Sequence, residues 1–211
     1  MLICLISDIH GNLPALEIVL KQTKAVDLYL SLGDVVNYAP WSNECVDLLD
    51  ALNNKILLLG NHEENFLKRE YAGDNPIAKS FHDFCIKTFN RFEAIGQYQK
   101  EFKIEGYHII HTIDNKIIFA DSDIILSQNS IVGHSHKQYI CEKQNFKLIN
   151  PGSVGQNRSF INIINYMIWD TEKNDFQCFS IKYNVQFVID KMIEMNYPEN
   201  CINYYQKKQK A

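Results

Sequence analysis

Five short runs of this sequence bring aspartate, asparagine and histidine together in a pattern that suits metal binding. The runs are Asp8-Ile9-His10, Gly33-Asp34, Gly60-Asn61-His62-Glu63, His111 and Gly133-His134-Ser135-His136. Imidazole combined with carboxylate and amide oxygens is a ligand set for Mn²⁺, Fe, Zn²⁺ or Mg²⁺, and imidazole favours the transition metals over Mg²⁺ alone. The chemistry to expect is therefore that of a metal centre.

Each run follows an apolar stretch that is predicted to be a buried strand. In an open α/β sheet ligands bind at the carboxyl ends of the strands, so all five runs could meet at one edge. Residues two apart on a strand project from the same face, which would let Asp8 and His10 reach one centre, and likewise His134 and His136. Taken singly, each run is typical of a turn, a helix start or a surface pair. Their joint occurrence in this order favours a site.

The first third of the chain alternates between predicted strands and helices. Strands are expected over Leu2–Ser7, Asp27–Leu32 and Lys55–Leu59. Asn12 is a good N-cap for the first helix, and Ser42 is expected to cap the second. Such alternation favours parallel strand pairing and an α/β architecture.

The remainder divides into helical, strand-rich and helical parts. Residues His62–Arg91 are predicted to be helical, with a break over Tyr71–Pro76. Short strand-like runs then follow at Glu101–Ile104, Tyr107–His111, Lys116–Ala120, Ser130–Val132, Gln138–Cys141, Lys147–Ile149, Ile161–Trp169 and Phe176–Ile181. Val185–Gln206 returns to helical spacing, and the basic run from Lys207 to Lys210 is expected to be solvated.

Length and charge exclude several classes of function. The 211 residues fit one domain, and the net charge of −4 offers no basic track for long nucleic acids or for a polybasic membrane contact. No apolar run is long enough to span a bilayer. The apolar N-terminus lacks a basic flank and is interpreted as a strand, not a signal peptide. Six scattered cysteines are expected to be reduced thiols in a cytoplasmic protein.

The motifs resemble those of the calcineurin-like metallophosphoesterase superfamily, in particular its small bacterial and archaeal phosphodiesterases. The resemblance covers nearly the whole chain and rests on Ile6–Asn12, Gly33–Tyr38, Gly60–Glu63, Gly133–His136 and Asn150–Gly155. It implies a single domain over 1–211 built as two packed mixed β-sheets flanked by helices, an α/β/β/α sandwich. It also implies a helical, lid-like segment at about 62–95.

The resemblance also implies a role for each matching residue. One divalent ion would be held by Asp8, His10 and His136, and a second by Asn61, His111 and His134, with Asp34 bridging both. Mn²⁺ is the first expectation, with Fe, Zn, Ni or Mg as alternatives. Water between the ions would lose its proton and attack phosphorus. His62 would be the general acid, and Glu63, where the family often has Asp, would orient His62 or a ligand.

The substrate is expected to be a small phosphorylated molecule, which could be a nucleotide, cleaved as a diester or a monoester. Arg158, Ser153 and Tyr38 are the predicted substrate contacts, although the turn containing Ser153 could equally be structural. Alternative functions are hydrolysis of a dinucleoside polyphosphate or a phosphoprotein. A non-catalytic interaction scaffold on the same fold is a further alternative, but such scaffolds typically lose metal ligands or the acid histidine.

Overall fold

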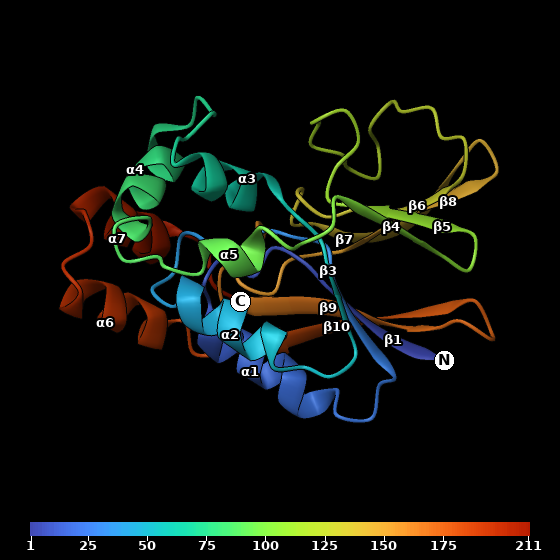
Figure 1. Ribbon diagram of the computed structural model, residues 1–211, viewed down its shortest axis with the longest axis horizontal. Helices are drawn as coiled ribbons and strands as arrows, with labels where there is room; N and C mark the ends of the chain where they lie inside the picture. Colours follow the sequence, from blue (N-terminus) through green and yellow to red (C-terminus); the bar gives the residue numbers. More distant parts are fainter.

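Two five-stranded β-sheets form the centre of the protein in a computed structural model that describes residues 1–211 (Figure 1). The first sheet contains β1 (Leu2–Ile6), β2 (Leu28–Ser31), β3 (Lys55–Leu57), β9 (Ile163–Asp170) and β10 (Asp175–Lys182). The second contains β4 (Glu101–Ile104), β5 (Tyr107–Ile110), β6 (Asn129–Ile131), β7 (Gln138–Lys143) and β8 (Phe146–Pro151).

The two sheets follow the same plan. Their strand orders are β10-β9-β1-β2-β3 and β4-β5-β6-β8-β7. Each has three neighbouring parallel strands, β1-β2-β3 in one and β5-β6-β8 in the other, with the remaining strands antiparallel. The predicted mixed sheets are therefore confirmed. Two sets of parallel strand ends become available to build one site.

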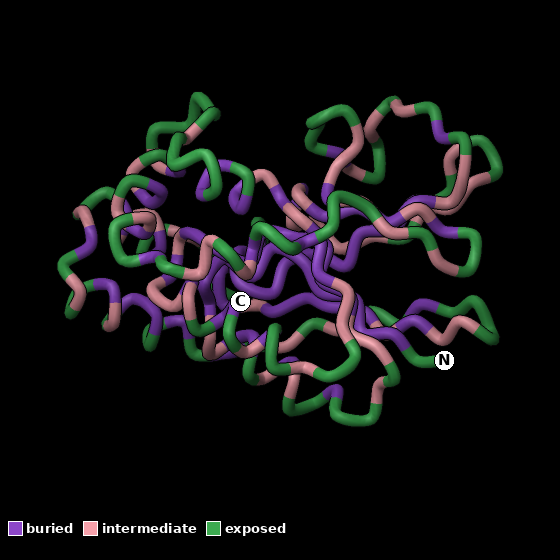
Figure 2. The backbone as a smooth tube through the Cα atoms, viewed as in Figure 1, coloured by how far each residue is buried: buried purple, intermediate pink, exposed green.

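Alternation of side chains along the strands separates two apolar layers. Ile3 and Leu5 of β1 face the second sheet, where they join Ile109 and Ile131 in a shared layer. Cys4 and Ile6 of the same strand point the other way, into the layer beneath the helices, because successive strand residues project to opposite faces. Figure 2 shows this continuous buried region running along the central strands.

Seven helices accompany the sheets. They are α1 (Leu13–Gln22), α2 (Ser42–Asp50), α3 (Asn61–Lys68), α4 (Pro76–Cys85), α5 (Phe92–Ile95), α6 (Gln186–Glu194) and α7 (Glu199–Lys207). Helices α1, α2, α6 and α7 contribute apolar residues to the layer outside the first sheet. The outer face of the second sheet is covered by residues 112–128, which contain no helix and insert Ile118 and Leu126 against Val132 and Leu148. None of the seven helices is long and apolar enough to cross a bilayer.

Helix boundaries confirm one predicted cap and correct another. Asn12 caps α1 as predicted, since its side chain accepts a hydrogen bond from the N–H of Ala15. The prediction for Ser42 is wrong, because Ser42 is the first residue of α2 and no side chain caps that helix. Its hydroxyl instead accepts the N–H of Asn37, so it holds the loop before the helix.

The strand predicted at Lys116–Ala120 is also wrong. This segment lies over the outer face of the second sheet and pairs with none of its strands. Side chains of β7 hold its backbone instead: Tyr139 donates to the carbonyl of Ile118, and the thiol of Cys141 donates to that of Ala120. Its apolar alternation therefore reflects one-sided packing of an irregular segment.

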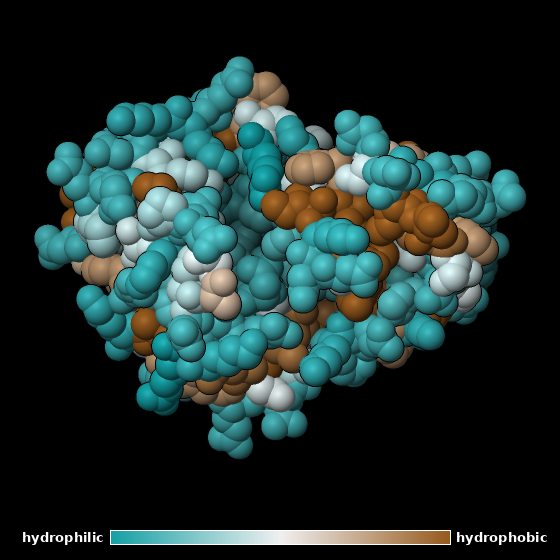
Figure 3. Space-filling model, turned by 90° about the horizontal axis from the view of Figure 1, so that it is seen from above, coloured by the Kyte–Doolittle hydropathy of each residue, from teal (hydrophilic) through white to brown (hydrophobic).

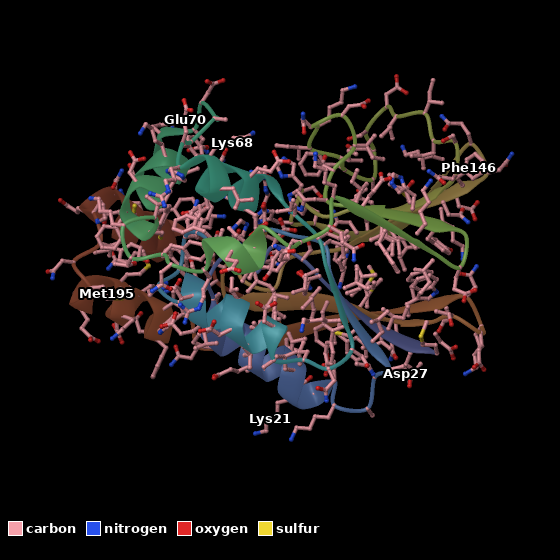
Figure 4. All side chains as sticks on the ribbon, viewed as in Figure 1. Lys21, Asp27, Lys68, Glu70, Phe146 and Met195 are labelled. Atoms are coloured by element: carbon pink, nitrogen blue, oxygen red, sulfur yellow. The ribbon has the colours of Figure 1, made fainter.

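The helical part between β3 and β4 has the predicted break. Helix α3 ends at Lys68 and α4 begins at Pro76, and the connecting loop projects from the molecule with Lys68 and Glu70 near its base (Figure 4). Helix α4 packs on α7 through Phe81, whose ring lies 5.7 Å from that of Tyr204. The segment expected to be lid-like is thus anchored to a helix near the end of the sequence.

The layer between the sheets should contribute strongly to stability. Leu30 is fully buried in that layer, so Leu30→Ala should lower the free energy of unfolding by about 2–5 kcal/mol, as cavity-forming substitutions do. Urea denaturation would measure this. Ile140→Ala, on a side chain that is 44% exposed, should change stability by about 0.5 kcal/mol or less. Equal effects of the two substitutions would contradict this assignment of the core.

Candidate active site

The candidate site lies where the carboxyl ends of five strands from both sheets converge. Asp8 and His10 follow β1, Asp34 follows β2 and Asn61 begins α3 just after β3. The second sheet contributes residues that follow directly or closely on β5 and β6, namely His111, His134 and His136. The seven predicted ligand positions therefore come together, although they are separated by up to 128 positions along the chain.

Four of these side chains form the first group. Ligand atoms of Asp8, His10, Asp34 and His136 all lie within 4.8 Å of one another. The Nε2 atoms of His10 and His136 are 3.3 Å apart, and Oδ1 of Asp8 lies 3.2 Å from Nε2 of His136. Three of the four residues are fully or almost fully buried.

The second group shares Asp34 with the first. Ligand atoms of Asp34, His111 and His134 lie within 4.8 Å of one another. Oδ2 of Asp34 is 3.2 Å from Nε2 of His111 and 4.0 Å from Nε2 of His10, so one carboxylate oxygen faces both groups. Oδ1 of Asn61 lies 3.1 Å from Nε2 of His111 and adds an amide oxygen to this second group.

Backbone carbonyls fix the orientation of three of the histidines. The Nδ1 atoms of His10, His111 and His136 lie 3.3, 2.8 and 2.6 Å from the carbonyl oxygens of Val36, Leu32 and Gln156, respectively. Since a carbonyl can only accept, Nδ1 of each ring carries a proton and Nε2 is the nitrogen that faces the site.

This arrangement of donor atoms is suited to binding cations. The Nε2 lone pairs of His10 and His136 face each other across 3.3 Å, which is repulsive unless a positive charge lies between them. Oδ1 of Asp8 and Oδ2 of Asp34 are buried without a hydrogen-bond partner. Buried polar atoms are normally satisfied, so the orphaned oxygens and converging imidazoles together form a donor set for divalent metal ions.

Electrostatics keep the carboxylates ionised. Burial raises the pKa of Asp34, but the imidazoles of His111 and His62 outweigh this and hold that pKa well below its usual range. The pKa of Asp8 is likewise lowered, because His136 outweighs the effect of burial. Burial and the neighbouring histidines lower the pKa of His10, so this imidazole stays neutral and able to bind a cation.

Left-handed backbone conformations, and not strand geometry, aim the site residues. Asp8, His10 and Asp34 have φ angles of 54°, 51° and 56°, and His134 and His136 have φ angles of 62° and 57°. Such values are uncommon for residues other than glycine and are held only where the surroundings over-determine them. Asp8 and His10 do come together, but the expected cause, alternation along a strand, is wrong, because both residues lie beyond β1.

Glu63 ties two site loops together. Its carboxylate is fully buried and accepts four backbone N–H groups, those of Asp34, Val35, Val36 and Gly60, at 2.7–3.0 Å. Burial raises the pKa of Glu63 to about 7, while these donors favour the ionised form. Of the two roles expected for Glu63, the structure shows the one toward the Asp34 loop, since no bond to His62 is present.

Asn37 is the partner of His62 that the sequence did not reveal. Nδ2 of Asn37 lies 2.9 Å from Nδ1 of His62, so in this orientation the amide donates to the ring and the proton remains on Nε2. Asn37 has a φ of 76°, a conformation that asparagine tolerates better than most residues. In the family that the sequence resembles, this loop is usually richer in glycine. The asparagine at position 37 was therefore the available sign of a specific role.

A cavity of about 370 Å³ opens beside these groups and is the size of a small-molecule site. It is lined by Asp34, Tyr38, Asn61, His62, Tyr71, Asn75, Ala78, His134, His136, Arg158, Tyr204 and Lys208. Seen from above, a hydrophilic hollow separates the helical part from the more apolar surface of the other half (Figure 3).

The three predicted substrate contacts differ in their positions. Tyr38 and Arg158 line the cavity, whereas Ser153 is fully buried and absent from its wall. The hydroxyl of Ser153 donates to the carbonyl of Asp8 and accepts the N–H of Gln156. This geometry favours the alternative in which the turn is structural, because it braces the backbone at Asp8.

Comparison with known proteins identifies the family to which the chain belongs. The model of the calcineurin-like phosphoesterase family matches residues 1–151, and the chain belongs to that family of metal-binding phosphoester hydrolases. An uncharacterized protein of Methanocaldococcus jannaschii is 31% identical over 231 aligned residues, covering 94% of each chain.

Solved structures share the fold over nearly the full length. A metallophosphoesterase from Sphaerobacter thermophilus has a TM-score of 0.78 at 23% identity, with 98% of each chain covered. A hypothetical protein from Pyrococcus horikoshii has a TM-score of 0.84 at 15% identity, covering 100% of this chain and 99% of the other. The fold thus extends beyond the family match, to β9, β10, α6 and α7.

Replacing the Glu63 carboxylate by an amide should destabilise the protein. In Glu63→Gln the side-chain NH₂ would face two buried N–H groups and leave them without an acceptor, at about 1–3 kcal/mol each. We expect a loss of at least about 2 kcal/mol in urea denaturation. Glu64→Gln is the matched control, because Glu64 is exposed on the same helix. A Glu63→Gln protein as stable as this control would exclude the cross-linking role.

Cation binding should strengthen as pH rises. Burial lowers the pKa of His111, but Asp34 outweighs it and raises this pKa to about 10, so the metal-free protein carries a proton there that a cation must displace. Burial and His111 lower the pKa of His134 to about 4, so that residue releases none. Mn²⁺ affinity should therefore rise about tenfold per pH unit between about pH 6 and 8.

Titration calorimetry in buffers of different ionisation enthalpy would measure both the affinity and the protons released. About one proton per protein is expected from His111. His108→Ala should keep the same slope, since His108 bonds to Glu101 on the second sheet and belongs to neither group. A pH-independent affinity would show that His111 is not displaced by the cation.

Proposed function

We propose that the protein is a dinuclear metal-dependent phosphoesterase that hydrolyses a small phosphorylated substrate, such as a nucleotide. The observation that carries this proposal is the position of Asp34, whose Oδ2 lies between the histidines of the two groups, 4.0 Å from His10 and 3.2 Å from His111. One metal would be held by Asp8, His10, Asp34 and His136, and the other by Asp34, Asn61, His111 and His134.

Two divalent cations in these positions would neutralise the phosphoryl oxygens and activate a water molecule as nucleophile. Asp34 sets the spacing between them, and Glu63 holds Asp34 in place through its N–H. The chain supplies the proton for the leaving group. His62 lines the cavity and Asn37 lies 2.9 Å from its Nδ1, so Nε2 is the ring nitrogen available to the substrate. To act as the acid His62 must be an imidazolium: with the Asn37 amide turned so that its Oδ1 accepts Nδ1–H, the ring would donate its Nε2 proton to the departing oxygen and return to the neutral form.

The cavity supports a small substrate over a polymer. Its volume of about 370 Å³ suits a nucleotide-sized molecule, and the chain carries a net charge of −4. Tyr71, Asn75 and Ala78, from α4 and the loop before it, border the cavity and support a lid-like role for that segment. We take Mn²⁺ as the metal, for its fit to mixed imidazole and carboxylate sites, and the cytoplasm as the location, because all six cysteines are free.

A non-catalytic scaffold could have the same fold as the enzyme, so only the residues of the site distinguish the two functions. A scaffold has no need for an oriented acid. Here His62 is buried beside both groups and is held by Asn37, which supports catalysis.

Hydrolysis of simple esters should reveal the activity and the acid. With Mn²⁺ the protein should cleave bis(p-nitrophenyl) phosphate or p-nitrophenyl phosphate, and EDTA should abolish this. His62→Ala should lower kcat on phenyl phosphate by about 100-fold or more, because phenolate needs a proton to leave. The loss on p-nitrophenyl phosphate should be smaller, since p-nitrophenolate is a stable anion.

The two p-nitrophenyl compounds separate a diesterase from a monoesterase, and a second histidine variant serves as the control. His108→Ala should keep wild-type activity, because His108 lies on β5 and bonds to Glu101. No Mn²⁺-dependent hydrolysis of any of the three esters would argue for the scaffold. An equal loss on phenyl and p-nitrophenyl phosphate in His62→Ala would remove His62 as the acid while leaving the metal centre.

A further inference from the structure

Two positively charged side chains line the cavity without any acidic partner. Arg158 and Lys208 both belong to the cavity wall, and neither makes a hydrogen bond or an ion pair with any residue. The only acidic residue on that wall is Asp34, which faces the histidines. Arg158 is exposed and Lys208 is half-buried, and two unpaired positive charges on one cavity wall are suited to binding an anion.

Backbone contacts near the end of the sequence hold Lys208 at the cavity. The last residues of the sequence are tied to the start of β9: the N–H of Ile161 donates to the carbonyl of Gln209, and the N–H of Ala211 donates to the side chain of Asn162. Figure 1 shows this end lying against the centre of the molecule. The ammonium of Lys208 lies 4.8 Å above the ring of Tyr204, so the basic run expected to be solvated contributes one half-buried side chain to the cavity.

Arg158 and Lys208 lie outside both ligand groups, although both groups contribute residues to the same cavity. Burial, together with the charges of Arg158 and Lys137, lowers the pKa of Lys208 to about 8. Lys137 already donates to Ser159, which leaves Arg158 and Lys208 as the unsatisfied pair.

We propose that Arg158 and Lys208 form a second anion subsite that binds a phosphate group of the substrate other than the one being cleaved. The proposal rests on the proposed function and narrows its substrate class to small molecules with two phosphate groups. Arginine can bind phosphate in a bidentate manner, and lysine adds a point charge opposite it. Tyr204 fixes the lysine by its ring and completes the wall.

Binding of two matched nucleotides would test the subsite independently of hydrolysis. Thymidine monophosphate and thymidine bisphosphate, the latter with phosphate on both sugar hydroxyls, would be titrated into the Mn²⁺-loaded protein by calorimetry. The wild type should bind the bisphosphate about tenfold or more tightly than the monophosphate. Lys208→Met and Arg158→Met should each remove most of that preference while leaving monophosphate binding unchanged.

Lys210→Met is the control, since Lys210 is exposed on the same terminal run and does not line this cavity; it should retain the preference. An unchanged preference in Lys208→Met would overturn the proposal. If Lys208→Met weakened the binding of both nucleotides equally, the proposal would also be overturned, because Lys208 would then bind the phosphate at the metal centre. The two proposals can fail independently. A protein that keeps its preference for the bisphosphate but shows no Mn²⁺-dependent ester hydrolysis would contradict the proposed function and not the subsite.

Discussion

Three hydrogen bonds from histidine rings to backbone carbonyls set the character of the site. The carbonyls of Val36, Leu32 and Gln156 each face the Nδ1 atom of one histidine and turn its Nε2 atom inward. The carbonyls of Leu32 and Val36 lie in the loop after β2, and that of Gln156 lies in the turn after β8. The facing Nε2 atoms of His10 and His136 repel each other and His111 carries a proton, so a cation that binds here relieves the repulsion and displaces that proton.

The same constraint explains why so much of the surrounding structure is polar yet buried. Glu63 gathers four N–H groups from two loops, and in doing so it fixes the backbone around Asp34. Gly60 is required beside it, because a Cβ there would lie 2.1 Å from the Asp34 carboxylate. The left-handed conformations at Asp8 and His10 are held by bonds from their N–H groups to the carbonyls of Gly33 and Asp34. Rigidity of this kind holds the candidate ligand atoms in place for a cation.

The two ligand groups and one wall of the cavity come from different parts of the chain. All seven ligand positions and His62 lie within the family match at residues 1–151. Arg158, Tyr204 and Lys208, which form one wall of the cavity, lie beyond it. The C-terminal part also supplies β9 and β10, which complete the first sheet next to β1.

The sequence by itself determined most of the strands and helices, the five site runs and the order in which they occur, whereas the arrangement in two packed sheets was expected only from the family resemblance. Apolar periodicity predicted the strands and helices, and Asp, Asn and His after strand ends predicted a metal-type site, because both depend on local patterns. Tertiary structure decided what local patterns do not encode. Long-range contacts made residues 112–128 a packed irregular cover, paired Asn37 with His62, buried Ser153 and brought Lys208 to the cavity. Each of these depends on a partner from a distant part of the chain, which no spacing within the sequence specifies.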